Sequence, residues 1–95
     1  MNKDLNKIHQ GVYKYLKTKK ADAEVKEFAE FPNNYGDNVS DFYVKYNIDD
    51  DYNYDMQRIK IEHSINIVFI ADRGYFSFKT LKDIKSIIDT KSKLK

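Results

Sequence analysis

The chain contains no cysteine and no tryptophan, and only one proline and three glycines among its 95 residues. Without cysteine there is no disulfide, no thiolate nucleophile and no thiolate zinc site. Long apolar runs are also missing, because the longest extends only from Ile67 to Ala71, whereas a membrane-spanning helix needs about 20 apolar residues. Residues 1–10 are polar and lack the apolar stretch of a secretory signal. We therefore expect a cytoplasmic protein.

The composition is typical of a folded domain, with 41% hydrophobic, 15% aromatic and 34% charged residues. Disordered chains are poor in aromatic residues, and a chain of this size has material for one core, so we expect a single domain over residues 1–95. Fifteen lysines accompany only two arginines, and Asn, Ile, Asp and Tyr are abundant. This usage is typical of A+T-rich codons, as in low-G+C bacteria and their phages, which indicates the cytoplasm of a bacterial host.

The formal net charge of +2 is the sum of three blocks of opposite sign. Residues 1–20 carry six lysines against Asp4, for +5. Residues 21–57 carry ten acidic residues against Lys26 and Lys45, for −8, and residues 58–95 carry nine basic residues against four acidic ones, for +5. Any charged surface should therefore be sought block by block.

Apolar spacing indicates helices in the first third of the chain. Leu5, Ile8, Val12 and Leu16 recur at helical intervals and predict an amphipathic helix over residues 3–17, although Gly11 lowers its stability by about 1 kcal/mol. Residues 21–31 continue a helical stripe and are predicted as helix, with a strand that pairs with the next element as the alternative. Residues 32–38, PNNYGDN, have the composition of a loop.

From Ser40 onward the period changes to two, which predicts strands. The first runs to Ile48, the second is a long strand over residues 58–71, and the third follows a turn at residues 72–74. Thr80 and Asp83 form a capping box before a helix predicted over residues 81–92, and residues 91–95 are predicted to fray. The predicted fold is α+β: an antiparallel three-stranded meander, four-stranded if residues 21–31 form a strand, packed against an N-terminal and a C-terminal helix.

The aspartate-rich stretch around residues 48–55 has part of the spacing of a calcium loop. Asp51, Asn53, Asp55 and Glu62 fall at positions 1, 3, 5 and 12 of an EF-hand. Position 6, where the bend needs glycine, is Met56, and position 12 lies inside a predicted strand. We therefore expect no metal ion, and nothing in the sequence indicates another cofactor.

The segment RGYFSFK has a basic residue and a glycine directly before aromatic residues. Its first three residues, Arg73, Gly74 and Tyr75, resemble the start of the RNA-binding strand motif of the RRM family, in which exposed aromatics stack on bases. On a strand, Tyr75 shares its face with Ser77, while Phe76 and Phe78 point the other way, so we interpret the segment as a turn that leads into a core strand. The order helix, three strands, helix is also that of double-stranded-RNA-binding domains.

Signatures of catalysis are missing from the sequence. His9 and His63 are the only imidazoles and lie on different predicted elements, so we expect each to be structural, with His63 on the isoleucine face of its strand. The chain has no nucleophile elbow and no P-loop. We therefore expect a protein that is not an enzyme and has no catalytic residues.

Aspartates and tyrosines alternate in the acidic block, on predicted loops and on the outer strand face. The candidate partner-binding residues are Tyr35, Asp37, Asp41, Tyr43, Asp49, Asp50, Asp51, Tyr52, Tyr54 and Asp55. Exposed tyrosines beside carboxylates suit protein binding, and negative charge attracts basic partners, which in cells are mostly nucleic-acid-binding proteins such as nucleases. The first hypothesis is thus a small inhibitor, similar in type to the anti-defence proteins of phages and mobile elements, anti-CRISPR proteins among them; the alternative is a merely hydrophilic turn.

Two other hypotheses use the basic blocks. Direct nucleic-acid binding would rely on lysines of the predicted helices, namely Lys14, Lys17, Lys19, Lys20, Lys82 and Lys85. Self-association, as a homodimer or head to tail, would pair the acidic block of one copy with a basic block of another.

Overall fold

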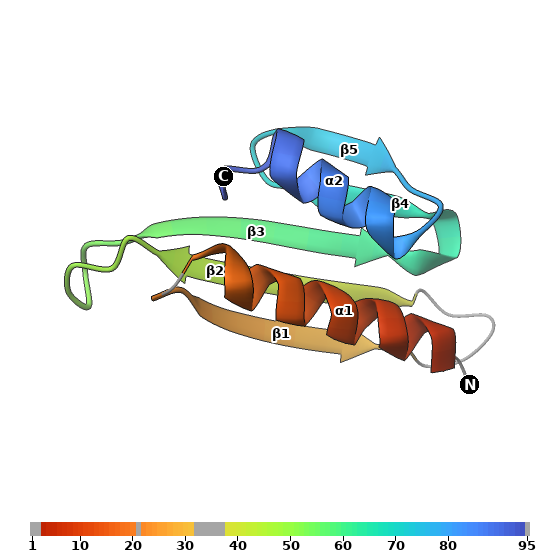
Figure 1. The fold of residues 1–95 in the computed structure, drawn as a ribbon, viewed down its shortest axis with the longest axis horizontal. Helices are drawn as coiled ribbons and strands as arrows, with labels where there is room; N and C mark the ends of the chain where they lie inside the picture. The colour runs from red at the N-terminus through yellow and green to blue at the C-terminus, as the bar shows by residue number, and fades with distance from the viewer. Residues whose placement is uncertain (1–2, 21, 32–37, 95) are drawn as a thin grey trace.

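The sheet of this protein is a five-stranded antiparallel meander in which each strand pairs with the next one along the chain (Figure 1). The structure is a computed structural model that describes residues 3–20, 22–31 and 38–94. Its elements are α1 (Lys3–Lys19), β1 (Glu24–Glu30), β2 (Val39–Tyr46), β3 (Asp55–Glu62), the 3-10 helix η1 (His63–Ile65), β4 (Ile67–Ile70), β5 (Gly74–Ser77) and α2 (Leu81–Lys91). The predicted α+β class with a helix near each end is confirmed, whereas the sheet has five strands instead of three or four.

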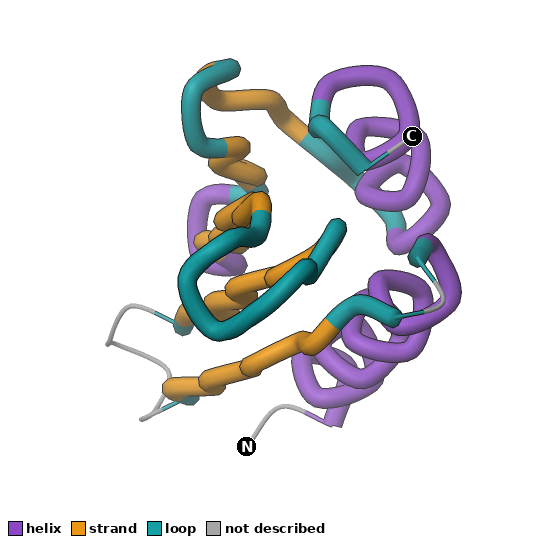
Figure 2. Tube along the Cα trace, turned by 90° about the vertical axis from the view of Figure 1, so that its left-hand side faces the viewer, coloured by secondary structure: helices purple, strands orange, loops and turns teal. Residues whose placement is uncertain are grey.

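Both helices lie side by side on one face of a curved sheet, and the opposite face is not covered by any described element (Figure 2). Strict alternation in β2 and β3 sends Phe42 and Ile59 inward, where they meet Leu16 of α1 and Ile88 of α2. All four side chains are fully buried. The single apolar core therefore fills the space between the sheet and the helices, and the outer face is left for other uses.

The helix predicted over residues 21–31 is wrong, and the alternative, a strand that pairs with the next element, is confirmed, because residues 24–30 form β1 beside β2. This strand is at the edge of the sheet and pairs only with β2, from Glu24 opposite Lys45 to Glu30 opposite Val39. Most of its side chains are exposed, so it does not need the alternation of apolar residues that marks a half-buried strand. Its charged side chains also protect an open edge from pairing with other chains.

The long strand predicted over residues 58–71 is in fact two strands, β3 and β4, joined by η1. The chain reverses at Asn66, which has φ 54° and ψ 48° in the left-handed region that asparagine tolerates. As a result Ile59 faces Ile70 and Ile61 faces Val68 across the sheet. One uninterrupted apolar pattern therefore supplies two neighbouring strands of the core.

The C-terminal helix begins at the predicted capping box. Thr80 accepts a hydrogen bond from the backbone N–H of Asp83 at 3.3 Å, and the Asp83 carboxylate accepts one from the backbone N–H of Thr80 at 3.0 Å. Within the tail that was predicted to fray, Ser92 and Leu94 are fully buried and the Lys93 N–H donates to Gln57 Oε1 at 2.9 Å. This short tail closes the core between α2 and the sheet.

The two helices run parallel and touch at several points. Gly11 of α1 lies so close to Leu81 that a Cβ atom on it would be 2.6 Å from Leu81 Cδ2. Further along, the Tyr15 hydroxyl donates to both carboxylate oxygens of Asp89, at 2.6 and 2.7 Å, and Lys19 Nζ lies 2.7 Å from the same carboxylate. Neither helix has the length and apolar content that spanning a membrane requires, and no other described helix has them.

Candidate functional site

The hairpin loop between β2 and β3, residues 47–54, is built around Asp50. Its carboxylate accepts hydrogen bonds from the backbone N–H groups of Tyr52 and Asn53, at 2.8 and 2.9 Å, and from the Asn53 side chain at 3.0 Å. The Asp49 N–H then donates to the carbonyl of Asn53 at 2.8 Å. The N–H of Tyr52, followed by the Asn53 amide, holds the pKa of Asp50 below its usual value. Asp50 therefore shapes the loop.

The remaining side chains of the predicted loop site are presented to solvent. Asp49, Asp51 and Tyr52 are exposed, and Tyr52 is the most accessible aromatic of the described chain at 92%. Tyr54 lies at the base of the loop, with the Lys45 ammonium 4.3 Å from its ring centroid. Asp55 opens β3 and accepts a hydrogen bond from the Asn47 side chain at 2.9 Å. The loop thus carries two exposed carboxylates and an exposed ring on a hydrogen-bonded backbone.

Asp41 and Tyr43 lie on the outer face of β2, as predicted, but Asp41 is not a free negative charge. The Arg58 guanidinium of β3 binds it through two nitrogens, at 3.1 and 2.7 Å, and also lies 5.2 Å from the Tyr43 ring. The hydrogen bond to Asp41 raises the pKa of Arg58. The predicted residues Tyr35 and Asp37 lie outside the described residues.

The outer face of the sheet carries several aromatic and apolar side chains that no helix covers. Phe28 of β1 is 57% exposed and Tyr75 of β5 is 70% exposed, and Met56 of β3 is also exposed. Phe28 packs edge-on against Tyr43, with centroids 6.1 Å apart, and Phe69 pairs with Tyr75 at 5.0 Å. The predicted orientation of Tyr75 away from the core strand face is confirmed, since the half-buried Phe76 packs on the core. We name this uncovered side, together with loop 47–54, the docking face.

Formal charges on the strands of the docking face balance. The outward positions of β1, β2 and β3 carry Glu24, Glu30, Asp41, Glu62, Lys26, Lys45, Arg58 and Lys60. Neighbouring strands pair these charges, as in the Lys45–Glu24 contact of 3.9 Å and the Arg58–Asp41 pair. The expectation of an acidic strand face is therefore wrong, and the negative charge of this side is concentrated in the hairpin loop.

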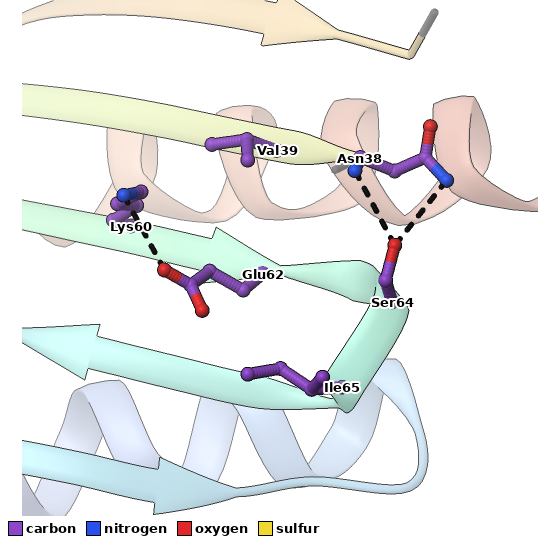
Figure 3. Close-up of a pocket in the computed structure, with 6 residues that line it drawn as sticks. All are labelled: Asn38, Val39, Lys60, Glu62, Ser64 and Ile65. Carbon is purple, nitrogen blue, oxygen red and sulfur yellow. Dashed lines mark hydrogen bonds and ion pairs between the residues drawn. The ribbon is translucent and has the colours of Figure 1, made fainter. Parts of the chain in front are cut away.

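Shallow hollows lie along the same face. One of about 110 Å³ opens beside η1, between the Lys60–Glu62 ion pair and the hydrogen-bonded Asn38 and Ser64, with Ile65 at its rim (Figure 3). In that view the helices lie behind the strands, so the hollow opens away from them. A second, of about 140 Å³, is lined by Tyr43, Lys45, Tyr54 and Met56, among others, at the base of the hairpin loop. The face is thus uneven, with exposed rings beside small depressions.

The six lysines of the alternative nucleic-acid hypothesis lie on the other side, on or beside the helices. Lys14, Lys17 and Lys82 are exposed, and Lys19 forms the ion pair with Asp89. Lys20 is 5.7 Å from the Tyr46 ring, and Lys85 is 5.3 Å from the Tyr15 ring. The fold therefore brings together lysines from both ends of the chain.

A buried polar network connects His9 and His63, which were predicted to lie on different elements. Ser40 Oγ lies 2.8 Å from His9 Nδ1 and 2.7 Å from His63 Nε2, and His9 Nε2 lies 2.7 Å from Glu27 Oε1. These residues come from α1, β1, β2 and η1. Phe31 packs edge-on against both imidazoles, with centroids 6.1 and 5.4 Å away. The prediction of His63 on a strand is corrected, because it opens η1.

The direction of each hydrogen bond follows from an ionised Glu27 and neutral imidazoles. His9 donates from Nε2 to Glu27, Ser40 donates to His9 Nδ1, and His63 donates from Nε2 to Ser40. The bare Nδ1 of His63 is then a buried acceptor with no partner among the described residues. Burial, followed by the electrostatic effect of the neighbouring His9, lowers the pKa of His63 to about 4.

The order Ser40, His9, Glu27 is that of a nucleophile, its base and an orienting carboxylate. A reacting serine must touch its substrate, yet Ser40 and His9 are 0% and 1% exposed. We therefore interpret the network as a brace that ties four elements together. Spacing in the sequence could not reveal it, since Glu27 and Ser40 lie on different strands and become neighbours only through the pairing of β1 with β2.

The calcium-loop spacing has no structural counterpart. Asp55 and Glu62 stand at opposite ends of the eight-residue strand β3, which separates them by roughly 23 Å at the usual rise of a strand. Within residues 3–20, 22–31 and 38–94, no group of three or more His, Asp or Glu side chains is arranged to hold a metal ion.

Comparisons of the chain with protein-family models, with curated proteins and with solved structures give no match. A function is therefore inferred from the two surfaces and the buried network of this chain.

Proposed function

We propose that this protein is a small non-catalytic binding protein whose docking face contacts the basic surface of another protein. The observation that supports this most strongly is the distribution of exposed apolar side chains. Every large hydrophobic side chain that is exposed in the described residues lies on the sheet side or in its connections, and none lies on α1 or α2; they are Phe28, Tyr52, Tyr54, Met56, Ile65 and Tyr75.

The chemistry of this face suits a protein partner better than a nucleic acid. Its strands are neutral overall, so they offer a phosphate backbone little attraction. Aromatic anchors inside a polar rim are instead the usual composition of a protein interface. The paired Asp41 and Arg58 would enter such an interface already neutralised, which limits the cost of removing them from water.

The hairpin loop gives the expected sign of the partner's charge. Asp49 and Asp51 precede Tyr52 in the same exposed loop and have no ion pair among the described residues, so a basic surface would complement them. Basic surfaces of this kind are common on nucleic-acid-handling proteins, nucleases included. The composition favours a phage or mobile-element inhibitor of a host defence or nuclease system, of the anti-CRISPR type, as the biological setting of this proposal.

The test measures separately what the Tyr52 ring and the loop carboxylates contribute to binding. A tagged protein is used to capture partners from a nuclease-treated lysate of a low-G+C bacterium, and the purified partner is then titrated with variants. We expect Tyr52→Ala to weaken binding by about tenfold or more, as for a buried aromatic anchor. Replacing both Asp49 and Asp51 with Asn should slow association and flatten its salt dependence. Asp50 is left intact, because its replacement would disorder the loop itself.

A matched control removes the same charge elsewhere. Asp4 and Asp22 are exposed acidic residues away from the loop, and their joint replacement with Asn lowers the negative charge equally. Affinity should be unchanged in this control. Equal weakening by both pairs, or a partner that is lost on nuclease treatment, would refute the proposal. Sedimentation at low and high salt distinguishes a heterologous partner from self-association through the same face.

A further inference from the structure

We infer that the outward surface of α1 and α2 is a second binding surface, which holds the phosphate backbone of a nucleic acid. This inference does not depend on the docking face. It begins from the charge of the helical layer: α1 carries five lysines against Asp4, for +4, and α2 carries three lysines against Asp83 and Asp89, for +1. We call this surface the lysine layer.

Two of these three carboxylates are already occupied within the fold. Asp83 accepts the backbone N–H groups of Lys79 and Thr80, at 2.8 and 3.0 Å, in the capping box. Asp89 accepts the Tyr15 hydroxyl and the Lys19 ammonium. Asp89 therefore compensates Lys19, and the Asp83 carboxylate is turned toward the helix cap, so the net charge of the two helices stays positive.

The lysines of the two helices form one surface. Lys19 of α1 and Lys85 of α2 lie over the same ring, 5.4 and 5.3 Å from the centroid of Tyr15. The Tyr15 hydroxyl is anchored on Asp89, which fixes the ring at the seam between the parallel helices (Figure 1). Elsewhere on α1, Lys17 lies 5.1 Å from the ring of Tyr13. The Tyr15 ring therefore holds one cation of each helix close to the other.

Lysines without a carboxylate partner remain available to an anionic ligand. In the part of the chain that the structure describes, neither Lys14 nor Lys17 nor Lys85 forms an ion pair. Binding of a phosphate to them would therefore break no existing salt bridge. This contrasts with Lys45 and Lys60 on the docking face, which pair with Glu24 and Glu62.

The composition of the lysine layer favours a nucleic acid over the other large anions. Neither helix presents an exposed large hydrophobic side chain in its described residues, and such side chains form the centre of most protein interfaces. A membrane-surface helix inserts a free apolar face, whereas the apolar stripe of α1, with Val12 and Leu16, is buried against the sheet. A phosphate backbone needs only closely spaced cations, so the binding would be independent of base sequence.

The inference is tested by fluorescence anisotropy with a labelled duplex of about 20 base pairs and arbitrary sequence, titrated from roughly 50 to 200 mM salt. Joint replacement of Lys14, Lys17 and Lys85 with Gln should weaken binding about tenfold or more at the lowest salt and reduce the slope of log affinity against log salt by about 2 to 3. The control replaces Lys26, Lys45 and Lys60 with Gln, which changes the net charge by the same amount on the opposite face. The control should bind within about twofold of the unmodified protein.

Folding is checked by thermal melting followed by circular dichroism. None of the six replaced lysines is buried, so both variants should melt like the parent. Equal weakening by the two triple variants would show a response to net charge alone and would overturn the inference. So would the absence of duplex binding by the unmodified protein at the lowest salt. Binding to phosphatidylserine vesicles but not to the duplex would also overturn it, because the partner would then be a membrane surface.

Discussion

At the scale of single residues, the most informative feature is the pair of buried histidines. Helix α1 and the end of β3 bring His9 and His63 to either side of the Ser40 hydroxyl, and Glu27 completes the chain. His63 is only 7% exposed, and its Nδ1 has no partner among the described residues. A proton added there would create a buried charge without a compensating group, so the folded state should resist its uptake.

This resistance predicts a pH dependence of stability. The pKa of His63 is about 4 in the folded state against an ordinary value of 6.5. Between these values the unfolded chain binds a proton that the folded protein does not, so stability falls as the pH is lowered through the window and is fully restored above 6.5. At about 1.4 kcal/mol per pKa unit, the loss should be roughly 3 kcal/mol. Urea unfolding at closely spaced pH values measures it.

The control for this prediction is His63→Gln, which has no titrating group and retains an N–H donor for Ser40. Its free energy of unfolding should be lower than that of the parent at neutral pH but nearly flat across the same window. Asp83 and Asp89 have pKa values below the ordinary 3.8, so the stability that they contribute is lost only as the pH falls below about 3.8. That range lies outside the window in which His63 acts. Parallel pH profiles of the variant and the parent would contradict the assignment to His63.

At the scale of elements, the sequence was sufficient where side chains alternate between core and solvent. Helix α1, strand β2 and the capped helix α2 were all predicted, because burial on one face imposes a regular period on each. Strand β1 was predicted only as the alternative to a helix, since both its faces are largely exposed and impose no clear period. The chain reversal at Asn66 was not predicted, because the isoleucines on either side of it, which belong to two strands, form one continuous alternating pattern. A turn residue inside a long apolar pattern was the signal that could have revealed it.

In the candidate site, too, some features could be predicted from local sequence and others could not. The exposed hairpin loop follows from local composition, so Tyr52 and the aspartates before it could be predicted as a solvent-facing group. The neutralisation of Asp41 by Arg58 and the meeting of the two histidines depend on strand pairing and on the position of α1. These contacts join residues that are distant in the chain, and one sequence carries no local pattern for them.

The contact between α1 and α2 gives a prediction for Gly11. Alanine in a helix interior is about 1 kcal/mol more favourable than glycine. A Cβ atom at position 11 would, however, lie 2.6 Å from Leu81 Cδ2, so Gly11→Ala alone should not raise stability. In a Leu81→Ala background the obstruction is gone, and the same change should stabilise the protein by about 1 kcal/mol. A double-mutant cycle by urea unfolding measures the difference, and equal effects in both backgrounds would show that the close approach is not limiting.

At the scale of the whole molecule, the fold redistributes the charge that the sequence presents in blocks. The acidic block loses much of its effect, because Glu27 faces His9, Asp41 faces Arg58 and Glu24 faces Lys45. The helices of the two basic blocks, by contrast, lie together on one side of the sheet, although Arg58 and Lys60 of the second block lie on the docking face. The molecule therefore has an aromatic face with an acidic loop and, across the sheet, a cationic face.

Because the sheet separates the two faces, their ligands should bind independently (Figure 2). Tyr52→Ala should leave duplex affinity within about twofold of the parent, since distant sites with no shared contacts act additively. The variant with Gln at positions 14, 17 and 85 should likewise retain the affinity for the captured protein partner. Anisotropy with the labelled duplex and titration with the purified partner test both arms on the same protein preparations. If either variant weakened both interactions, the two ligands would share a surface, and the separation of the docking face from the lysine layer would be wrong.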